Sequence, residues 1–321
     1  MTQASAIATA NDDSTYTQRT AYFNGQYIKE CEATISIYDR GFLYGDAAYD
    51  VARTYAHKPF QYEDHIDRLY RSLRYLRIDP QMSPQEMLDI SNEVTAQNMK
   101  LLSPSDDFRM VWRITRGDGV KAPTPDGTPH EPTVLIHNDP VRWKSMAHNY
   151  VHGGHLQTSR IRVDDPQSID VKAKLHSKLA HALADVEAQE KEPGAIALML
   201  DQRGCVAEAS RANIFVVDRG RLLTPKRRTI LPGISRATVM QLAQNLGIEV
   251  VEDDLDVSDV YNTQEIFLTA ASPFIEPISM IDGLEVPGPY PGPITKQIIS
   301  AFSELAGVDF VQQAIANAGK S

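Results

Sequence analysis

The feature that most constrains the fold is a change of hydrophobic period after about residue 62. Before it, residues 21–28 predict a β-hairpin, because Asn24-Gly25 suits the left-handed turn of a two-residue loop. Residues 33–37 alternate as a strand does, and residues 52–62 predict a second hairpin. Beyond it, residues 66–76 carry apolar side chains at helical spacing. Strands followed by a helix predict an α+β fold.

Later segments continue this mixed pattern. Ser83-Pro84-Gln85-Glu86 predicts a helix start, because a serine and a glutamate three residues apart form a capping box and proline suits the first turn. The remaining predicted strands lie at 108–115, 133–137, 195–200, 213–217, 248–251 and 265–269, and the remaining helices at 173–190, 235–246 and 295–305.

The length of the chain bears on its domain organisation. A chain of 321 residues exceeds what one hydrophobic core usually organises, so two domains are expected. Residues 139–154 show no clear period and contain Pro140, Gly153 and Gly154, which predicts a linker. The predicted organisation is a disordered leader at 1–19, a small α+β domain at 20–138, the linker at 139–154 and a larger domain at 155–321.

Charge and composition exclude several classes of function. The formal net charge of -10 argues against nucleic-acid binding, which needs a basic surface. The sequence contains no run of about 18 apolar residues, so no membrane span is predicted. Cys31 and Cys205 are far apart and predict reduced thiols in a cytoplasmic protein. His148, His152 and His155 have a spacing that suits metal ligands on a helix, but they fall in or beside the predicted linker, so no metal site is predicted.

Two segments suit an anionic group. Residues 231–236 form a glycine turn that enters a predicted helix, where free N–H groups and the Ser235 hydroxyl bind phosphate. The same pattern also suits a plain N-cap. Arg68, near the apolar stripe of its helix, can reach a phosphate with two parallel hydrogen bonds, or it pairs with Asp64 or Asp67 at the surface.

Two further residues suit chemistry on an amine. Lys172 lies at or just before the start of a predicted helix, and a lysine partly withdrawn from water becomes a nucleophile toward carbonyl groups. Lys174 and Lys178 compete for that role, and the sequence alone does not choose among the three. Glu208 precedes an apolar run, where a carboxylate can hold a pyridine nitrogen protonated or simply lie exposed in a loop.

The order and spacing of these segments resemble the class IV family of pyridoxal-phosphate (PLP) aminotransferases, to which D-amino-acid and branched-chain aminotransferases belong, over about residues 22–302. The matching stretches are 41–46, 65–69, 170–172, 208, 213–215, 231–236 and 292–296. The resemblance implies fold type IV, with a small α/β N-terminal domain and a larger barrel-like C-terminal domain. It also implies PLP as the cofactor and a homodimer.

The resemblance implies roles for individual residues. Lys172 matches the catalytic lysine that holds the cofactor as a Schiff base and moves the substrate proton, and Glu208 matches the carboxylate beside the pyridine nitrogen. Ala271 takes the place of the usual threonine in the second phosphate loop, so it offers only its N–H. The implied cofactor-binding residues are Arg68, Lys172, Glu208, Ile234, Ser235, Ala271 and Ser272.

The predicted substrate pocket departs from the known patterns of the family. Tyr49-Asp50-Val51 is closer to D-amino-acid and (R)-amine transaminases than to branched-chain enzymes, and Tyr49 matches a pocket aromatic. Branched-chain enzymes have Tyr-x-Arg where this chain has Arg109-Met110-Val111, and D-amino-acid enzymes have Arg-x-His where it has Lys121-Ala122-Pro123. The candidates for binding a substrate carboxylate are Arg53, Arg109 and Arg211.

The function that follows is transfer of an amino group from a donor to a 2-oxo acid. A D-amino acid or an (R)-amine is the favoured donor, and a branched-chain L-amino acid is the alternative. A lyase acting on aminodeoxychorismate and a non-catalytic binding relative also remain open. The expected partners are therefore small molecules and a second copy of the chain, with neither nucleic acid nor a membrane.

Overall fold

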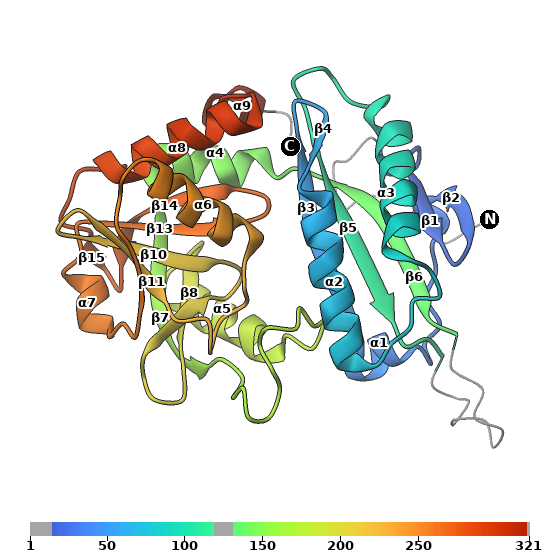
Figure 1. The fold of residues 1–321 in the computed structure, drawn as a ribbon, viewed down its shortest axis with the longest axis horizontal. Coiled ribbons are helices and arrows are strands. Elements are labelled where there is room, and N and C mark those ends of the chain that lie inside the picture. Colours follow the sequence, from blue (N-terminus) through green and yellow to red (C-terminus); the bar gives the residue numbers. More distant parts are fainter. Residues whose placement is uncertain (1–14, 119–130, 320–321) are drawn as a thin grey trace. The chain divides into compact units, whose positions relative to one another are not determined.

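The computed structural model describes residues 15–118 and 131–319 (Figure 1). The chain divides into two compact units, and the second is discontinuous in sequence. The first comprises residues 1–144, 173–177 and 316–321, and the second comprises 145–172 and 178–315. Most of the predicted leader, 1–14, and the segment Lys121-Ala122-Pro123 lie outside the described residues.

The first unit is a six-stranded antiparallel sheet in the order β2-β1-β6-β5-β3-β4. Two long helices, α2 and α3, pack on one face of it and bury an apolar core with Trp112 and Leu69 (Figure 1). The elements are β1 (Thr20–Phe23), β2 (Gln26–Lys29), the 3-10 helix η2 (Glu30–Glu32), α1 (Arg40–Tyr44), β3 (Ala47–Tyr55), β4 (Lys58–Phe60), α2 (Tyr62–Leu76), α3 (Pro84–Met99), β5 (Phe108–Thr115) and β6 (Thr133–Pro140).

Local sequence signals account for several of these boundaries. Asn24 and Gly25 both have positive φ, 44° and 89°, as the turn between β1 and β2 requires. Ser83 Oγ accepts from Glu86 N, and Glu86 Oε2 accepts from Ser83 N, so the predicted capping box opens α3. The hairpins and both helices of this unit are therefore confirmed.

The second unit is built around a nine-stranded sheet whose main path is β12-β11-β10-β13-β14-β7-β8-β9, with β15 paired to β14. The backbones of Ala209 and Ala212 bridge β9 to β10, which curls the path from β10 to β9 around an apolar core. The strands are β7 (Gly154–Arg162), β8 (Ile196–Leu200), β9 (Val206–Ala209), β10 (Asn213–Asp218), β11 (Arg221–Pro225), β12 (Val250–Asp253), β13 (Glu265–Ala270), β14 (Phe274–Ile281) and β15 (Leu284–Glu285). The curled sheet confirms the predicted barrel-like domain and the α+β class.

Helices accompany this curled sheet. Ala184 and Ala188 of α5 pack against Ala197 and Met199 of β8 in a separate apolar cluster. The helices are α4 (Trp143–His152), α5 (Leu179–Lys191), α6 (Ile234–Asn245), α7 (Val257–Tyr261), α8 (Pro293–Ala306) and α9 (Phe310–Asn317). Among the residues that the structure describes, no helix combines the length and the apolar character needed to cross a bilayer.

Three sequence predictions differ from the structure. Residues 33–37 form no strand, and Ile35 and Ile37 are exposed without a neighbouring strand to pair with. The predicted linker contains the end of β6 and the helix α4, whose buried residues Trp143, Met146, Ala147 and Tyr150 have helical spacing. The helix predicted from residue 173 begins at Leu179, so Lys172 lies in a turn rather than at a helix start.

Candidate active site

The start of α6 in the second unit has the features of an anion site. Gly233 is the N-cap, and no side chain of residues 15–118 or 131–319 accepts from the first-turn N–H groups of this helix. Ser235, in the first turn, is buried, and within the described part of the chain its hydroxyl makes no hydrogen bond. A Cβ on Gly233 would lie 2.1 Å from Asn213 Oδ1, so only glycine fits. The helix therefore presents N–H donors and the positive end of its dipole.

Glu208 lies on β9 beside the same turn. The carboxylate is 6% exposed, and its Oε2 accepts hydrogen bonds from Asn213 Nδ2 (3.0 Å) and from Leu231 N (2.9 Å). Its Oε1 lies 3.7 Å from Nε2 of the buried His181. Asn213 Nδ2 also donates to Leu231 O. Asn213 thus couples the carboxylate to the turn that precedes α6, a role that sequence reasoning did not assign.

Lys172 belongs to the second unit, in the turn between β7 and α5. Its side chain is 48% exposed, and its Nζ is 3.8 Å from Asp170 Oδ2, which also belongs to the second unit. Lys174 is held differently, in the first unit: its carbonyl accepts from Tyr49 N, its N–H donates to Ser72 Oγ, and its Nζ lies 4.6 Å from the Tyr49 ring centroid. Of these two lysines, Lys172 has the more accessible amine.

The other predicted residues of the second unit lie on turns. Ala271 and Ser272 are half-buried between β13 and β14, and Ser272 Oγ lies 3.9 Å from Met146 Sδ. Arg211 is exposed between β9 and β10. Burial raises the pKa of Glu276, and a hydrogen bond from Asn149 and the charge of Arg211 oppose that rise.

Arg68, in the first unit, is part of a buried charge network on the helix-covered face of the sheet. Its Nε and Nη2 donate to the two oxygens of Asp50 at 2.8 and 2.7 Å, and His65 Nδ1 lies 2.8 Å from Asp50 Oδ1. Burial would raise the pKa of Asp50, but Arg68 and His65 outweigh it and hold that pKa well below its usual range. Burial lowers the pKa of His65, against the pull of Asp50. The Arg68 guanidinium is therefore held in one orientation.

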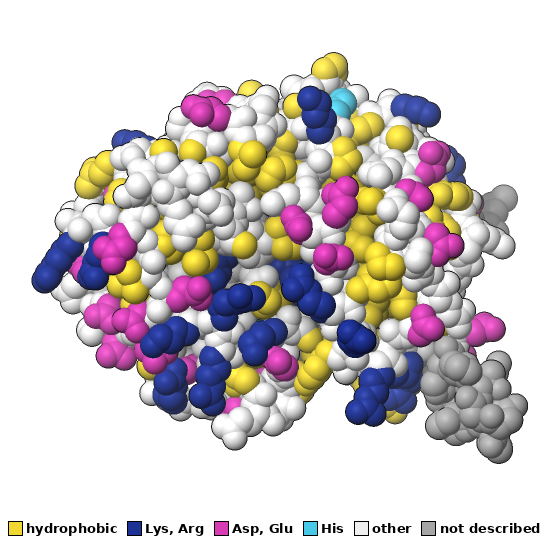
Figure 2. Space-filling model, viewed as in Figure 1, with side chains coloured by type: hydrophobic (Ala, Val, Ile, Leu, Met, Phe, Trp, Pro, Cys, Tyr) yellow, Lys and Arg dark blue, Asp and Glu magenta, His cyan; other side chains and the backbone are white. Residues whose placement is uncertain are grey.

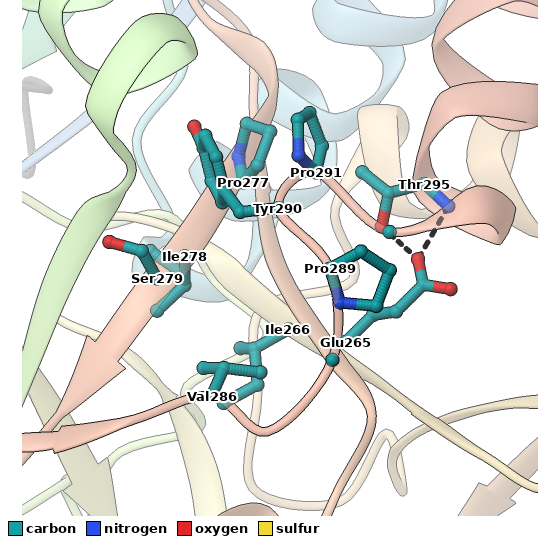
Figure 3. A pocket seen from close by; sticks show the side chains of 12 residues that line it. Glu265, Ile266, Pro277, Ile278, Ser279, Val286, Pro289, Tyr290, Pro291 and Thr295 are labelled. Atoms are coloured by element: carbon teal, nitrogen blue, oxygen red, sulfur yellow. Dashed lines mark hydrogen bonds between the residues drawn. The ribbon is translucent and has the colours of Figure 1, made fainter.

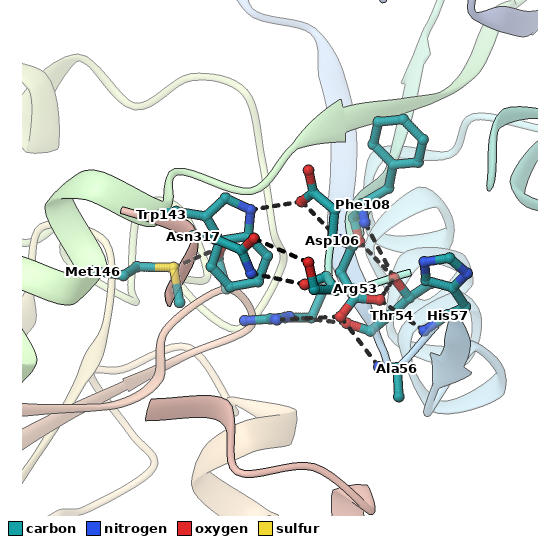
Figure 4. Close-up of polar contacts among 12 residues, drawn as sticks. Arg53, Thr54, Ala56, His57, Asp106, Phe108, Trp143, Met146 and Asn317 are labelled. Carbon is teal, nitrogen blue, oxygen red and sulfur yellow. Dashed lines mark hydrogen bonds and ion pairs between the residues drawn. The ribbon is translucent and has the colours of Figure 1, made fainter. Parts of the chain in front are cut away.

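The remaining candidate arginines make intramolecular contacts. Arg53, labelled in Figure 4, is 1% exposed, and its guanidinium carbon lies 4.1 Å from the Tyr55 ring centroid and 5.2 Å from that of Trp143. Its Nε donates to Thr54 O at 3.0 Å. Arg109 Nη2 donates to Asp139 Oδ2 at 2.7 Å. These contacts make Arg53 a packing residue of the first unit.

A small pocket elsewhere in the second unit contains none of the predicted site residues. Its lining includes Glu265, Pro277, Tyr290, Pro291 and Thr295 (Figure 3). Glu265 points toward the first turn of α8, where its carboxylate accepts from Thr295 (Figure 3). The matching stretch 292–296 thus begins a helix that an internal carboxylate already caps.

Comparison with known proteins identifies the family. The model of the amino-transferase class IV family matches residues 47–281, more than half of the chain. The chain belongs to the class IV aminotransferases. It is 32% identical over 288 residues, 88% of this chain and 95% of the relative, to a Methanocaldococcus jannaschii protein provisionally named a branched-chain-amino-acid aminotransferase. It is also 29% identical over 282 residues, 87% of this chain and 94% of the relative, to D-alanine aminotransferase of Bacillus licheniformis.

Solved structures give the same assignment. The branched-chain amino acid aminotransferase of Escherichia coli aligns with a TM-score of 0.82 at 28% identity, covering 89% of this chain and 94% of that one. The Thermobaculum terrenum enzyme, solved in its PLP form, aligns at 0.78 and 25% identity over 93% and 97% of the two chains. The class IV enzyme described here is thus a fold type IV aminotransferase with PLP as its cofactor. The relatives include both branched-chain and D-alanine aminotransferases, so they do not identify the amino donor of this enzyme.

The residues of the second unit fit this cofactor. The start of α6 offers uncapped donors for a phosphate, and Glu208 Oε1 accepts no hydrogen bond from the described residues, so it suits a pyridine N–H. Lys172 offers an accessible amine in the same unit. Sequence reasoning assigned no role to Asn213 or His181, which both lie against Glu208. Asn213 had a signal in the sequence, because it begins the matching stretch 213–215 and precedes the buried run of β10.

Proposed function

We propose that this aminotransferase moves an amino group from a D-amino acid or an (R)-amine to a 2-oxo acid, with Lys172 as the residue that bonds the cofactor. Two features of the second unit support the proposal most strongly. The start of α6 has no capping side chain among the described residues, and the buried Glu208 has one oxygen that accepts no hydrogen bond from them. When bound, pyridoxal phosphate supplies an electron sink that allows a proton to leave the substrate Cα.

Lys172 is proposed to make the covalent link and then to carry the Cα proton on its freed amine. Its side chain is about half exposed, and its Nζ lies 3.8 Å from Asp170 Oδ2. Lys174 is a weaker candidate because its ammonium already lies against the Tyr49 ring. A lysine that serves as nucleophile and base needs an amine that can reach the ligand, which favours the more exposed Lys172.

Phosphate binding is assigned to the start of α6 and to two further segments. Ile234 and Ser235 would donate N–H groups and a hydroxyl, and the turn at Ala271 and Ser272 would add donors. Arg68 is the arginine that the family resemblance assigns to the phosphate, and within the first unit Asp50 orients its guanidinium. Figure 2 shows Lys and Arg side chains gathered over part of the second unit, which suits anionic ligands despite the net charge of -10.

Glu208 is proposed to accept the proton-bearing ring nitrogen on Oε1. The two donors on Oε2, Asn213 Nδ2 and Leu231 N, fix the carboxylate and leave the other oxygen for the ligand. A carboxylate placed there keeps the ring nitrogen protonated, which strengthens the electron sink. His181 would hold the carboxylate from the other side.

The preference for a D-amino acid or an amine as donor is inferred from strand β5 of the first unit. At the position of the branched-chain Tyr-x-Arg motif, Arg109 is paired with Asp139 and Val111 is apolar and buried. That strand therefore lacks the carboxylate clamp of the branched-chain enzymes, which favours a D-amino acid or an amine. Tyr49 would line the pocket, and the exposed Arg211 would bind a substrate carboxylate. Arg53 is left out because its guanidinium is buried.

A homodimer in the cytoplasm completes the proposal. Six large apolar side chains between residues 35 and 44 are exposed, with Phe42 at 72% and Ile37 and Tyr44 at 67%. Such a cluster on a folded unit suits an interface with a second copy. Phe42→Glu should therefore lower the measured mass from dimer to monomer, whereas Leu284→Glu, at another exposed apolar residue, should not. Cys31 and Cys205 are free thiols, which suits a reducing compartment.

The test of the lysine assignment is covalent capture. The holoenzyme is reduced with borohydride, and the labelled peptide is identified by mass spectrometry. Lys172→Ala should lose the label and the cofactor's visible absorption, while Lys174→Ala and Lys178→Ala should retain the label. A label that persists in Lys172→Ala overturns the assignment.

The test of the donor is a panel of D-amino acids, L-amino acids and (R)-amines, read by loss of the visible absorption of the lysine-bound cofactor. Recovery of that absorption on adding a 2-oxo acid supports transamination. Release of pyruvate without any acceptor supports a lyase, and no change with any donor supports a binding protein. Arg211→Ala should lower kcat/KM about tenfold or more for amino-acid donors but not for simple amines. Arg219→Ala, a surface arginine of the same unit that is 88% exposed, is the matched control.

A further inference from the structure

We propose that Glu30, His137 and Asp139 of the first unit form a binding site for a divalent transition-metal ion, with Zn²⁺ as the best match. One ligand atom from each residue lies within 4.8 Å of the other two. The proposal is independent of the transamination site, since none of these residues takes part in the proposed amino transfer.

The fold of the first unit brings these side chains to one place. His137 and Asp139 are two residues apart on β6, so their side chains leave the same face of the sheet. Glu30 begins η2 directly after β2, and β2 pairs with β1, which pairs with β6. Glu30 thereby comes within reach of His137. Arg109 lies opposite Asp139 and Val111 opposite His137 on β5.

His137 is the independent observation that points to a ligand. The residue is 6% exposed, and neither ring nitrogen has a hydrogen-bond partner in the described part of the chain. Buried polar atoms without partners are rare in folded proteins and call for an explanation such as a bound ion. Nδ1 is aimed into the cluster, 3.3 Å from Glu30 Oε1 and 3.5 Å from Asp139 Oδ1.

These distances match tetrahedral coordination. Zinc binds histidine nitrogen and carboxylate oxygen at about 2.1 Å, which separates two ligand atoms of a tetrahedron by about 3.4 Å. An imidazole nitrogen with two carboxylates is a mixed nitrogen and oxygen set, which suits zinc and its neighbours. Calcium and magnesium prefer six or more oxygen ligands and are poorer matches. Water would fill the fourth position, as in other three-ligand zinc sites.

Two arginines hold the carboxylates in place from outside. Arg19 Nε donates to Glu30 Oε2 at 2.5 Å, and Arg109 Nη2 donates to Asp139 Oδ2 at 2.7 Å. Each arginine therefore occupies the oxygen that faces away from His137 and leaves the other oxygen for the ion. Ligating carboxylates are commonly oriented by such outer hydrogen bonds. The two positive charges also reduce the negative charge of the site, so moderate affinity is expected.

The test is Zn²⁺ titration of the holoenzyme by calorimetry, after chelator treatment and in a phosphate-free buffer. Wild-type protein should bind one ion per chain, and His137→Ala should bind at least tenfold more weakly. Co²⁺ in place of Zn²⁺ should give the visible absorption of tetrahedral coordination in wild-type protein but not in His137→Ala. Cys31→Ser, which removes an exposed thiol, and His148→Ala, which removes a histidine outside the site, are controls and should bind Zn²⁺ normally.

Three results would overturn the proposal. They are no ion bound by wild-type protein, unchanged affinity in His137→Ala, and loss of the ion in His148→Ala instead. If His137→Ala does not fold, Glu30→Gln keeps the shape of the side chain and removes the charge. Zn²⁺ binding of unchanged affinity in Glu30→Gln would then reject the site, and an ionic contact of protonated His137 with the two carboxylates would replace it.

Discussion

Two helices of the second unit, α6 and α8, begin with similar sequences but are completed in different ways. Both have a glycine at the N-cap, and neither glycine tolerates a side chain, because a Cβ on Gly233 would meet Asn213 and one on Gly292 would meet Glu265. At α8, the Glu265 carboxylate accepts from Ile294 N at 3.0 Å, from Thr295 N at 2.8 Å and from Thr295 Oγ1 at 2.7 Å (Figure 3). At α6, no side chain among the described residues accepts from the N–H groups of Ile234, Ser235 or Arg236.

The difference explains which helix start is available to a ligand. The first-turn N–H groups of a helix need an acceptor, and a carboxylate from the protein or a phosphate from a ligand serves equally well. Glu265 is buried and supplies the acceptor for α8 permanently. Within the part of the chain that the structure describes, no carboxylate accepts from the first turn of α6, and Asn213 in the equivalent place against its glycine is neutral. We therefore expect anions from solution to act on α6 and not on α8.

The largest expected effect is that of removing the internal anion of α8. Glu265→Ala should lower the free energy of unfolding by about 3 kcal/mol, because the buried N–H and hydroxyl of Thr295 and the partly buried N–H of Ile294 lose a charged acceptor. Urea denaturation of the holoenzyme measures this loss. Glu304→Ala, at an exposed position of the same helix, should leave the stability nearly unchanged. Equal stability of the two variants would remove the contrast between the helices.

The next effect comes from giving α6 the internal anion that it lacks. Ser235→Asp should weaken binding of the phosphorylated cofactor about a hundredfold, because a carboxylate competes with and repels the phosphate. Ser235→Ala, which removes only the hydroxyl, should cost about tenfold. Equilibrium titration of the apoprotein with cofactor measures both. Ser258→Ala in α7, an exposed serine, is the control. Unaltered affinity in Ser235→Asp would show that the phosphate does not bind at α6.

A smaller effect tests a single bond at the α8 start. Thr295→Val removes the hydroxyl that donates to Glu265 Oε2 and should lower the free energy of unfolding by about 1 kcal/mol. Thr238→Val in α6 removes a hydroxyl that donates back to Ile234 O within its own helix and not to a buried carboxylate such as Glu265, so its effect should be smaller. The same denaturation experiment compares the two, and a larger loss for Thr238→Val would contradict the assigned role of Glu265.

Local signals of the sequence predicted most of the fold correctly. The Asn24-Gly25 turn, the capping box at Ser83 and Glu86 and the stop of α6 at Gly247 depend on residues that are neighbours in the chain. Errors arose where packing decides. Residues 33–37 alternate like a strand but have no strand to pair with, and α4 was taken for a linker although its buried residues follow a helical period.

The residues of the candidate site also divide into those that the sequence predicted and those that only the packing revealed. The order of the motifs around Lys172, Glu208 and Ser235 was enough to predict the family and the cofactor, and both are confirmed. Residues that act through contacts distant in sequence were not found. Asn213 connects Glu208 to Leu231, and Asp50 holds Arg68 through a contact 18 residues away. The sequence also offered Arg53 as one of three candidate arginines, and its packing against Tyr55 is a contact that the sequence does not predict.

The sequence by itself determined where strands and helices begin, because turns, caps and periodic apolar positions act over a few residues. It also determined the class of chemistry, because the lysine, the carboxylate and the glycine turn follow one another in a recognisable order. Only the tertiary structure decided which of the two glycine-led helices is left without an internal anion. The reason is that Glu265 reaches α8 from a strand 30 residues earlier, and nothing in the local sequence of either helix records whether such a partner arrives.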